Sequence, residues 1–260
     1  AVQNGTCSLA YSSVYSISVD PTTTVGNLGG GNTPICQGSS IGTLMLGAST
    51  GNIVRWEKRL NGGSWINIPN TKSTYTEVPS SGGRWDYRVL VQSGGCSSLY
   101  SNTFQIIVNP TLTLTLGSNP VICRGTVTAL LPYSATTGTP NAYSIDFDAT
   151  ANAVGFGDVN GWGLTSSPIS INVPWDIAPG VYNGVLTVAT TYPVCSSIGY
   201  PFTITINTPP ASAGIISGAS TVSAGQSGVT YTVPAIPGAT NYIWAYSGGG
   251  ATINGNGNTV

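Results

Sequence analysis

The sequence holds very few charged side chains and no histidine. Of its 260 residues, 7 are Lys or Arg and 8 are Asp or Glu, so 6% are charged, against roughly 25% in ordinary soluble domains. A nucleic-acid-binding surface needs clustered basic residues, and histidine is the commonest general base and metal ligand. These absences exclude nucleic acid as a partner and disfavour an enzyme or a metalloprotein.

Long hydrophobic runs are also absent. No apolar stretch approaches the roughly 20 residues that span a bilayer, and the first residues lack the basic and apolar regions of a signal peptide. We therefore expect no membrane span, and we interpret the chain as a mature or excised piece. The 35 Gly and 17 Pro predict many turns, while the hydrophobic fraction of 40% is enough to build packed cores.

One motif occurs three times and closes each of three units. It consists of a cysteine, a short turn, an alternating apolar run and a proline 14 residues after the cysteine, and it covers 7–21, 96–110 and 195–209. The apolar positions coincide in the first two copies. In the third they slip by one, which would reverse the faces of the strand unless a bulge absorbs the offset.

A second motif also occurs three times and marks the start of a repeat. Residues 34–38 and 120–125 share an Ile-Cys-x-Gly core, and 221–225 occupy the same place with Ser223 instead of cysteine. The motif recurs after 87 and then 100 residues, which is the length of one β-sandwich domain. The predicted divisions are the C-terminal strand of a preceding repeat (1–20), two complete repeats (21–110 and 111–208) and the N-terminal half of another (209–260). We expect the natural chain to continue in both directions.

Short alternating runs bounded by turn residues recur along the two complete repeats, as in 112–116, 169–173 and 185–188. Trp56 lies 20 residues after Cys36, in a run that reads as a central strand. This pattern predicts an all-β fold of tandem immunoglobulin-like β-sandwich domains.

Five cysteines in a β-rich chain of this kind suggest disulfides. Each complete repeat holds one opening and one closing cysteine, so we expect the pairs Cys36–Cys96 and Cys123–Cys195. Cys7 is left without a partner. The alternative is five buried free thiols in a reducing compartment. A zinc site is disfavoured because the sequence has neither a CxxC motif nor histidine.

Residues 122–148 and 167–184 resemble the repeats of giant surface adhesins in Bacteroidota, proteins associated with gliding motility and exported by the type IX secretion system. Residues 213–244 resemble the PKD-like repeat of the same proteins. The resemblance implies an extracellular protein attached to the outer membrane of a Gram-negative cell, acting as a stalk or adhesive surface. It supplies no catalytic residue and no cofactor.

The acidic residues Asp146, Asp148 and Asp158 are the candidate ligands of a Ca²⁺ ion, which takes 6–8 oxygens. The alternative places Asp146 and Asp148 on the solvated face of a strand, and we expect no other metal site. A glycosidase carboxylate pair is disfavoured without a surrounding catalytic domain.

Aromatic residues could form a platform for sugar, but most Trp residues in sandwiches are core residues. We therefore expect core positions for Trp162, Trp175, Tyr182 and Tyr192. Trp65, in a predicted hairpin loop, is the exposed candidate for ligand binding. We expect five basic residues on solvated faces of neighbouring strands: Arg55, Lys58, Arg59, Arg84 and Arg88.

The sequence thus predicts a non-enzymatic repeat region of a long cell-surface adhesin or filament. The alternative is an accessory stalk or carbohydrate-binding region of a secreted polysaccharide-degrading enzyme. Expected partners are neighbouring repeats of the same chain, surface polysaccharide or the substratum, and the type IX export apparatus.

Overall fold

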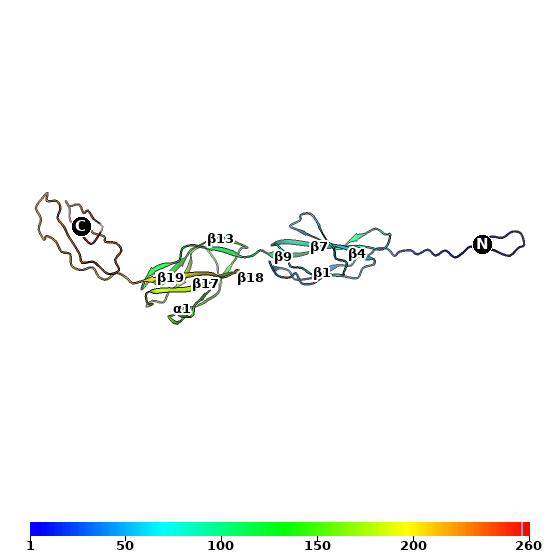
Figure 1. Ribbon diagram of the computed structural model, residues 1–260, viewed down its shortest axis with the longest axis horizontal. Helices are drawn as coiled ribbons and strands as arrows, with labels where there is room; N and C mark the ends of the chain where they lie inside the picture. Colours follow the sequence, from blue (N-terminus) through cyan, green and yellow to red (C-terminus); the bar gives the residue numbers. More distant parts are fainter. Residues whose placement is uncertain (256) are drawn as a thin grey trace. The chain divides into compact units, whose positions relative to one another are not determined.

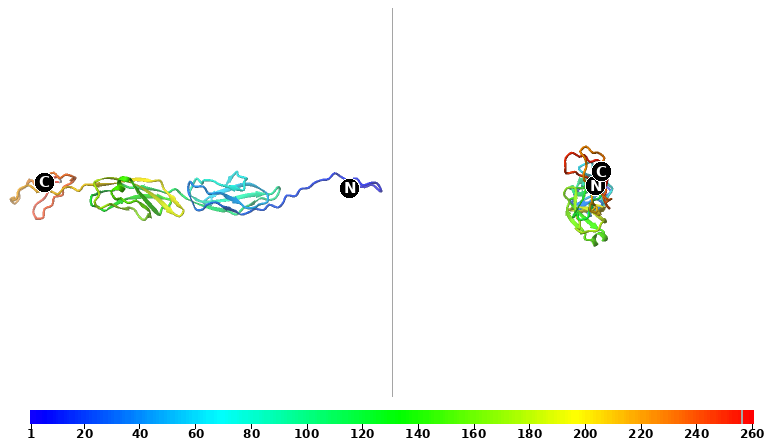
Figure 2. Two further views of the ribbon diagram at one scale, coloured as in Figure 1. Left: turned by 90° about the horizontal axis from the view of Figure 1, so that it is seen from below. Right: turned by 90° about the vertical axis from the view of Figure 1, so that its left-hand side faces the viewer.

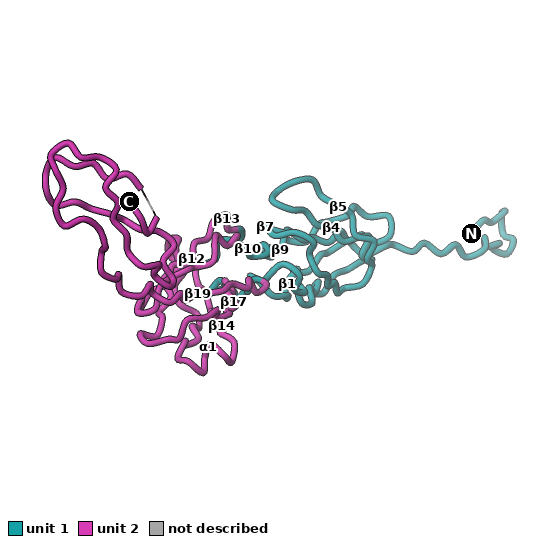
Figure 3. The backbone as a smooth tube through the Cα atoms, turned by 60° about the vertical axis from the view of Figure 1, so that its left-hand side comes forward, with its two compact units in different colours: residues 1–113, 137–140, 189–197 teal, residues 114–136, 141–188, 198–260 magenta. Residues whose placement is uncertain are grey.

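A computed structural model describes residues 1–255 and 257–260 and divides them into two compact units (Figure 3). Unit 1 consists of 1–113, 137–140 and 189–197, and unit 2 of 114–136, 141–188 and 198–260. Unit 1 holds the first sandwich, and unit 2 holds most of the second. No helix in the described residues is long and apolar enough to cross a membrane.

The first sandwich packs a larger sheet on a smaller one (Figure 1). All neighbouring strands are antiparallel except β2 and β9, which run parallel. The larger sheet has the order β2 (Ile35–Cys36), β9 (Phe104–Asn109), β7 (Gly83–Gln92), β4 (Asn52–Leu60), β5 (Ile66–Ile68), with β8 (Leu99–Tyr100) also paired to β7. The smaller sheet has the order β1 (Leu28–Gly30), β3 (Leu44–Leu46), β6 (Thr74–Tyr75).

The core of this sandwich follows the alternation of its strands. Trp56 of β4 and Tyr87 of β7 are fully buried and pack with Leu44 of the opposite sheet. This confirms the strand predicted around Trp56 and places its side chain in the core. Burying each of these side chains contributes about 2 kcal/mol at roughly 25 cal/mol per Å², so the apolar inner faces hold the two sheets together.

The second sandwich repeats the strand order of the larger sheet. Its largest sheet has the order β11 (Val121–Cys123), β19 (Tyr200–Asn207), β17 (Gly180–Thr191), β14 (Ala142–Phe147), β15 (Val159–Gly163), with β18 (Val194–Ser196) paired to β17. Its other pairs are β10 (Thr113–Leu116) with β13 (Tyr133–Thr137) and β12 (Thr128–Leu131) with β16 (Ile169–Asn172). A five-residue helix, α1 (Ala149–Ala153), follows β14.

The one-residue slip in the third closing motif does not reverse the strand. Phe202, Ile204 and Ile206 of β19 are buried. The last two strands end in matching registers, since Asn207 is opposite Cys123 as Asn109 is opposite Cys36. The turn before β19 and the linker after it absorb the offset, so β19 needs no bulge.

The outer segments differ from the sandwiches. Residues 15–19, expected as the last strand of a preceding repeat, form an exposed extended segment without a strand (Figure 2). None of the described sheets provides a partner strand for them, and a strand needs such pairing to be stable. Within the described part of 209–260 the β pairs are isolated bridges, Ser217 with Thr232 and Thr232 with Thr259.

Candidate functional sites: a disulfide bond and a charged sheet face

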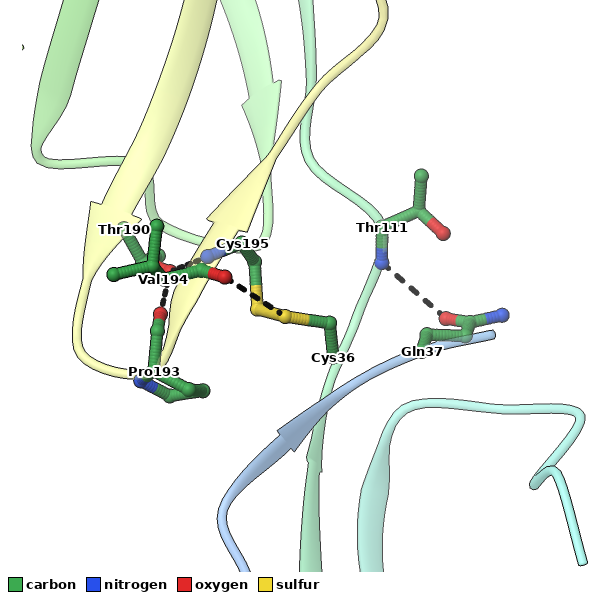
Figure 4. The surroundings of a disulfide bond; sticks show 7 residues. All are labelled: Cys36, Gln37, Thr111, Thr190, Pro193, Val194 and Cys195. Carbon is green, nitrogen blue, oxygen red and sulfur yellow. Dashed lines mark hydrogen bonds between the residues drawn. A yellow bond between two sulfur atoms is a disulfide. The ribbon is translucent and has the colours of Figure 1, made fainter. Parts of the chain in front are cut away.

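The opening cysteine Cys36 lies at the end of an edge strand. Its β2 strand pairs with the end of β9, and the next residue, Gln37, donates its backbone N–H to the Asn109 carbonyl at 2.8 Å. Gly38 then turns the chain with a φ of 89°, which glycine adopts without steric cost. The Gln37 side chain also accepts a hydrogen bond from the Thr111 N–H at 3.3 Å. These contacts hold Cys36 beside the Asn109–Thr111 linker (Figure 4).

The closing cysteine Cys195 lies in β18, the second strand of the hairpin that β17 and β18 form. The Thr190 hydroxyl stabilises this turn, because it donates to the Pro193 carbonyl at 2.6 Å and accepts from the Cys195 N–H at 3.2 Å. Cys195 is bonded to Cys36, 159 residues away in the sequence, with their Cα atoms 5.6 Å apart. The hairpin tip that carries Cys195 belongs to unit 1.

This bond overturns the predicted pairs Cys36–Cys96 and Cys123–Cys195. Cys36 lies beside the start of β7, while Cys96 follows the end of that ten-residue strand, about 30 Å away at ~3.3 Å per residue. Cys123 and Cys195 are separated in the same way by the length of β17. A disulfide needs Cα atoms within about 7 Å, so neither predicted pair can form within its own sandwich.

Three cysteines carry free thiols in the structure. Cys7 and Cys123 are exposed, and Cys96 is partly buried. Ser223 occupies the position of the opening cysteine in the segment 209–260. The turn of the motif is kept there, since the Gln226 N–H donates to the Ser223 carbonyl at 3.1 Å. The corresponding bonds to Cys36 and Cys123 measure 3.0 and 3.1 Å.

The outer face of β4 and β7 carries two buried carboxylates under four arginines. Only 3% of each carboxylate side chain, Glu57 and Asp86, is exposed. Glu57 accepts hydrogen bonds from Arg55 Nε and Arg88 Nε, both at 2.7 Å. Asp86 accepts one from Arg59 Nε at 2.9 Å, and Arg84 lies 3.5 Å from it. The predicted solvated face is therefore an ion-pair network with its acids buried.

The network keeps Glu57 ionised. Burial raises the pKa of its carboxyl, but the hydrogen bonds from Arg55 and Arg88, with the charge of Arg88, outweigh burial and lower the pKa below its ordinary value. Charged partners that donate directly to a carboxylate have this effect. With four arginines and two carboxylates, the face is positively charged in a chain whose net charge is −1.

Trp65 lies over this face. Its ring is 4.5 Å from the guanidinium carbon of Arg59 and 4.0 Å from that of Arg88, and Arg88 also stacks on Tyr100 at 3.8 Å. Arginines stack favourably on aromatic faces. The residue proposed as an exposed platform is thus half-buried, and the arginines hold it in place.

Lys58 differs from its neighbouring arginines, because it points to the other face of β4. It pairs with Glu77, which also accepts hydrogen bonds from the hydroxyls of Tyr75 at 2.9 Å and Tyr87 at 2.7 Å. Burial, with the hydrogen bond to Glu77 second, raises the pKa of both tyrosines well above the ordinary value. This cluster closes one side of the first core.

The three candidate Ca²⁺ ligands have separate roles in the second sandwich. Asp148 caps α1 through the Ala151 N–H at 2.8 Å and accepts from Asn183 at 2.7 Å, which lowers the pKa of its carboxyl. Asp158 accepts from the Phe147 N–H at 2.9 Å. Asp146 and Asp148 line a shallow pocket of about 440 Å³. In the described residues no group of three or more His, Cys, Asp or Glu side chains could hold a metal ion.

Three of the four aromatic residues expected in the second core lie outside it. Trp162, Trp175 and Tyr192 are exposed, and only Tyr182 is buried. Tyr182 packs on Phe156 with ring centroids 5.2 Å apart. The prediction was wrong for the other three because Trp162 faces outward on β15 at the sheet edge, while Trp175 and Tyr192 lie in turns.

Two family models match parts of the chain. Residues 25–110 match a domain of unknown function (DUF8696), and residues 209–260 match a PKD-like domain. No curated protein matches the chain. The PKD-like match agrees with the resemblance noted for this segment.

Several solved structures are similar to this chain. The fibronectin(III)-like modules of Clostridium thermocellum CbhA are 9% identical with a TM-score of 0.30, over 72% of this chain and 95% of that one. The FN1–FN3 domains of chicken CNTN1 are 10% identical with a TM-score of 0.32, over 84% and 78%. The N-terminal four Ig domains of Dscam1 isoform 4.4 are 15% identical with a TM-score of 0.34, over 74% and 47%.

The observations define the class of protein at a general level. The chain is a tandem array of β-sandwich repeats with a PKD-like segment and a disulfide. Disulfides persist in oxidising compartments outside the cytosol. The chain is therefore an extracellular protein of a structural or adhesion type.

Proposed function

We propose that the chain is the structural repeat region of a long cell-surface adhesin or filament and has no catalytic activity of its own. The observation that carries this proposal is the Cys36–Cys195 bond. It joins an edge strand of the first repeat to a hairpin of the second and closes a loop of 159 residues. In the chain-entropy model such a loop stabilises by about 5 kcal/mol.

The bond also redirects mechanical load. A force applied between the chain ends passes through the two sulfur atoms and bypasses the residues between Cys36 and Cys195. Most residues of both sandwich cores lie in that bypassed segment, which contains the long strands β7 and β17. Such an arrangement suits a stalk that must stay folded while it bears tension.

The particular function we propose is attachment or gliding motility in a member of the Bacteroidota, with export by the type IX secretion system and attachment to the outer membrane. The resemblance of 122–148, 167–184 and 213–244 to adhesin repeats supports this proposal, as does the PKD-like segment. The proposed partners are neighbouring repeats, the substratum or surface polysaccharide, and the export apparatus.

Stretching single molecules of residues 1–260 between their ends tests the mechanical role. Without reductant we expect no extension from the residues between Cys36 and Cys195. With reductant we expect about 57 nm of additional contour length, at ~3.6 Å per residue. The Cys36→Ser variant is the control and should release this length without reductant. Full release from the unaltered chain without reductant would contradict the proposal.

The second candidate function is carbohydrate binding within a secreted polysaccharide-degrading enzyme. The positively charged face with Trp65 over Arg59 and Arg88 favours it. An array of neutral and acidic glycans tests it with the unaltered chain and the Trp65→Ala variant. Binding that is lost with Trp65 would support this function, and an array without signal would exclude it for these repeats.

A further inference from the structure

We propose that Cys96 and Cys123 form the same head-to-tail disulfide as Cys36–Cys195, each with a neighbouring repeat of this kind in the same chain. Cys96 would bond the opening cysteine of the repeat before it. Cys123 would bond the closing cysteine of the repeat after it. This inference rests on the proposed function as a structural repeat array, and it adds a covalent rule for how the repeats are joined.

Cys123 occupies the same structural position as the bonded Cys36. Each ends an edge strand that runs parallel to the last strand of its sandwich, opposite an asparagine, Asn109 or Asn207. In each case the following N–H donates to that asparagine's carbonyl, at 2.8 Å from Gln37 and 2.9 Å from Arg124. The glycine of the motif has a φ of 89° after Cys36 and 88° after Cys123.

Cys96 corresponds to the bonded Cys195 in the closing motif, although Cys195 lies in β18 and Cys96 lies in the turn before β8. Each comes four residues after the end of the long strand that pairs with the last strand of its sandwich, Gln92 of β7 or Thr191 of β17. Since Cys195 reaches an opening cysteine from this position, Cys96 is placed to do the same. It cannot use Cys36, which lies at the opposite end of its own sandwich.

The linker at Cys96 supplies an independent observation. The Gly95 N–H donates to the Asp20 carboxylate at 3.0 Å, and the Cys96 sulfur lies 3.6 Å from the Pro21 carbonyl oxygen. Asp20–Pro21 corresponds in the repeat to Asn109–Pro110, the linker held beside Cys36 through Gln37 (Figure 4). The Cys36–Cys195 bond brings together an opening cysteine, a closing cysteine and this linker. At Cys96 the closing cysteine and the linker Asp20–Pro21 are already in contact.

The register identifies the partner. Cys36 lies opposite Asn109, the residue before the linker proline. An opening cysteine in the same register beside residues 15–20 would lie opposite Asp20, which contacts the turn of Cys96. The chemistry that fits is therefore the Ile-Cys-x-Gly motif of another repeat.

Each such bond is an oxidation with a balanced exchange. A cysteine thiolate attacks the disulfide of an oxidant, and the second cysteine's thiolate then displaces the oxidant's remaining sulfur. The two protein thiols lose two protons and two electrons in total, and the oxidant's disulfide is reduced to two thiols. The oxidant belongs to the class of disulfide-containing oxidoreductases or, in vitro, oxidised glutathione.

The consequence is a chain of overlapping covalent loops. The 36–195 loop already includes Cys123, so a bond from Cys123 to the next repeat would begin before the first loop ends. By contrast, the pairs Cys36–Cys96 and Cys123–Cys195 within single repeats would leave residues 97–122 outside every loop. With head-to-tail pairs, every linker between the first and last bonded cysteines lies inside a loop. A single backbone break between those two cysteines therefore leaves the molecule covalently connected.

The test extends the chain by one repeat. A second copy of 22–110 is inserted between Pro110 and Thr111, so that its first residues follow a proline as they do after Pro21. Exposed Ser39 and Ser98 are replaced by threonine in this copy, which gives its cysteine peptides distinct masses. After refolding with oxidised and reduced glutathione, non-reducing peptide mapping identifies the bonds.

We expect the first copy's Cys36 to bond the second copy's Cys96, with the loss of two hydrogen masses, and the second copy's Cys36 to bond Cys195. The control replaces the second copy's Cys96 with serine. It should leave the first copy's Cys36 open to alkylation, while the bond between the second copy's Cys36 and Cys195 persists. A second copy of 111–209 inserted after Pro209 tests Cys123 in the same way, with a bond expected to the second copy's Cys195.

Two results would overturn the inference. One is a bond between Cys36 and Cys96 of the same copy, and the other is a second-copy Cys96 that stays fully open to alkylation. If Cys36–Cys195 forms in the unextended chain while either result is found, the proposed function stands and only the inference fails. Without Cys36–Cys195 in the unextended chain, the structural proposal fails first.

Discussion

The charged residues of this protein are few, and the first sandwich holds most of them in two networks. Glu57 is buried beneath Arg55 and Arg88, and Glu77 is shared by Lys58, Tyr75 and Tyr87. The alternation of β4 predicts that Arg55, Glu57 and Arg59 share a face. It does not predict that the acids are buried while the arginines stay partly exposed, because that depends on cross-strand neighbours from β7 and on Trp65.

The Glu57→Gln substitution should destabilise the first sandwich by about 2 kcal/mol, because two arginines lose a charged acceptor that water cannot replace in this buried position. Urea denaturation followed by tryptophan fluorescence measures the change. The matched carboxylate-to-amide control is Asp176→Asn, whose ion pair with Arg124 is exposed on both sides. The control should cause no measurable change, and equal effects from both would refute the assigned role of burial.

The lowered pKa of Glu57 predicts how stability depends on pH. Since the folded-state pKa lies below the ordinary value of 4.5, the contribution of Glu57 is complete above that value and is lost as the pH falls through the folded-state pKa. The difference in unfolding free energy between the unaltered protein and Glu57→Gln should thus be constant near pH 7 and shrink below about pH 4. A difference that grows on acidification would contradict the assignment.

At the scale of the elements, patterning predicts the strands that are half-buried and paired over their full length. The predicted runs 112–116, 169–173 and 185–188 correspond closely to β10, β16 and part of β17. Residues 229–233 also alternate between apolar and polar side chains, yet they contain only a bridge at Thr232. An alternating sequence forms a strand only where a partner strand supplies hydrogen bonds, and pattern alone does not show whether a partner is present.

The entry into β4 depends on a glycine. Gly51 has a φ of 113°, and an added Cβ would lie 2.6 Å from the Gln92 carbonyl group at the end of β7. The Gly51→Ala variant should therefore lose about 2 kcal/mol or more, from backbone strain and from the clash. Gly29→Ala on β1 is the control, because its Cβ would meet nothing within 4 Å and its φ is ordinary. Thermal unfolding of both variants decides the point, and equal melting temperatures would exclude this role for Gly51.

At the scale of the whole molecule, the Cys36–Cys195 bond makes a large part of the backbone redundant for covalent continuity. A protease site placed in the exposed turn at 61–64 lies inside the loop. After cleavage there, the two fragments should migrate together without reductant and separate with it. A site placed at 208–210 lies outside the loop, and cleavage there should separate the fragments under both conditions. Separation without reductant in the first case would show that the bond does not form.

The class of fold and the strand that contains Trp56 could be predicted from the sequence. These features follow from local patterning, turn residues and internal similarity, all of which can be read along the chain. Which cysteines pair could not be predicted from the sequence, because pairing depends on which strand ends meet in the folded chain. Opening and closing cysteines of one repeat lie at opposite ends of their sandwich, so the bond joins Cys36 to the closing cysteine of the next repeat. The exposure of Trp162 and Trp175 was decided in the same way, by the sheet edge and turn that hold them.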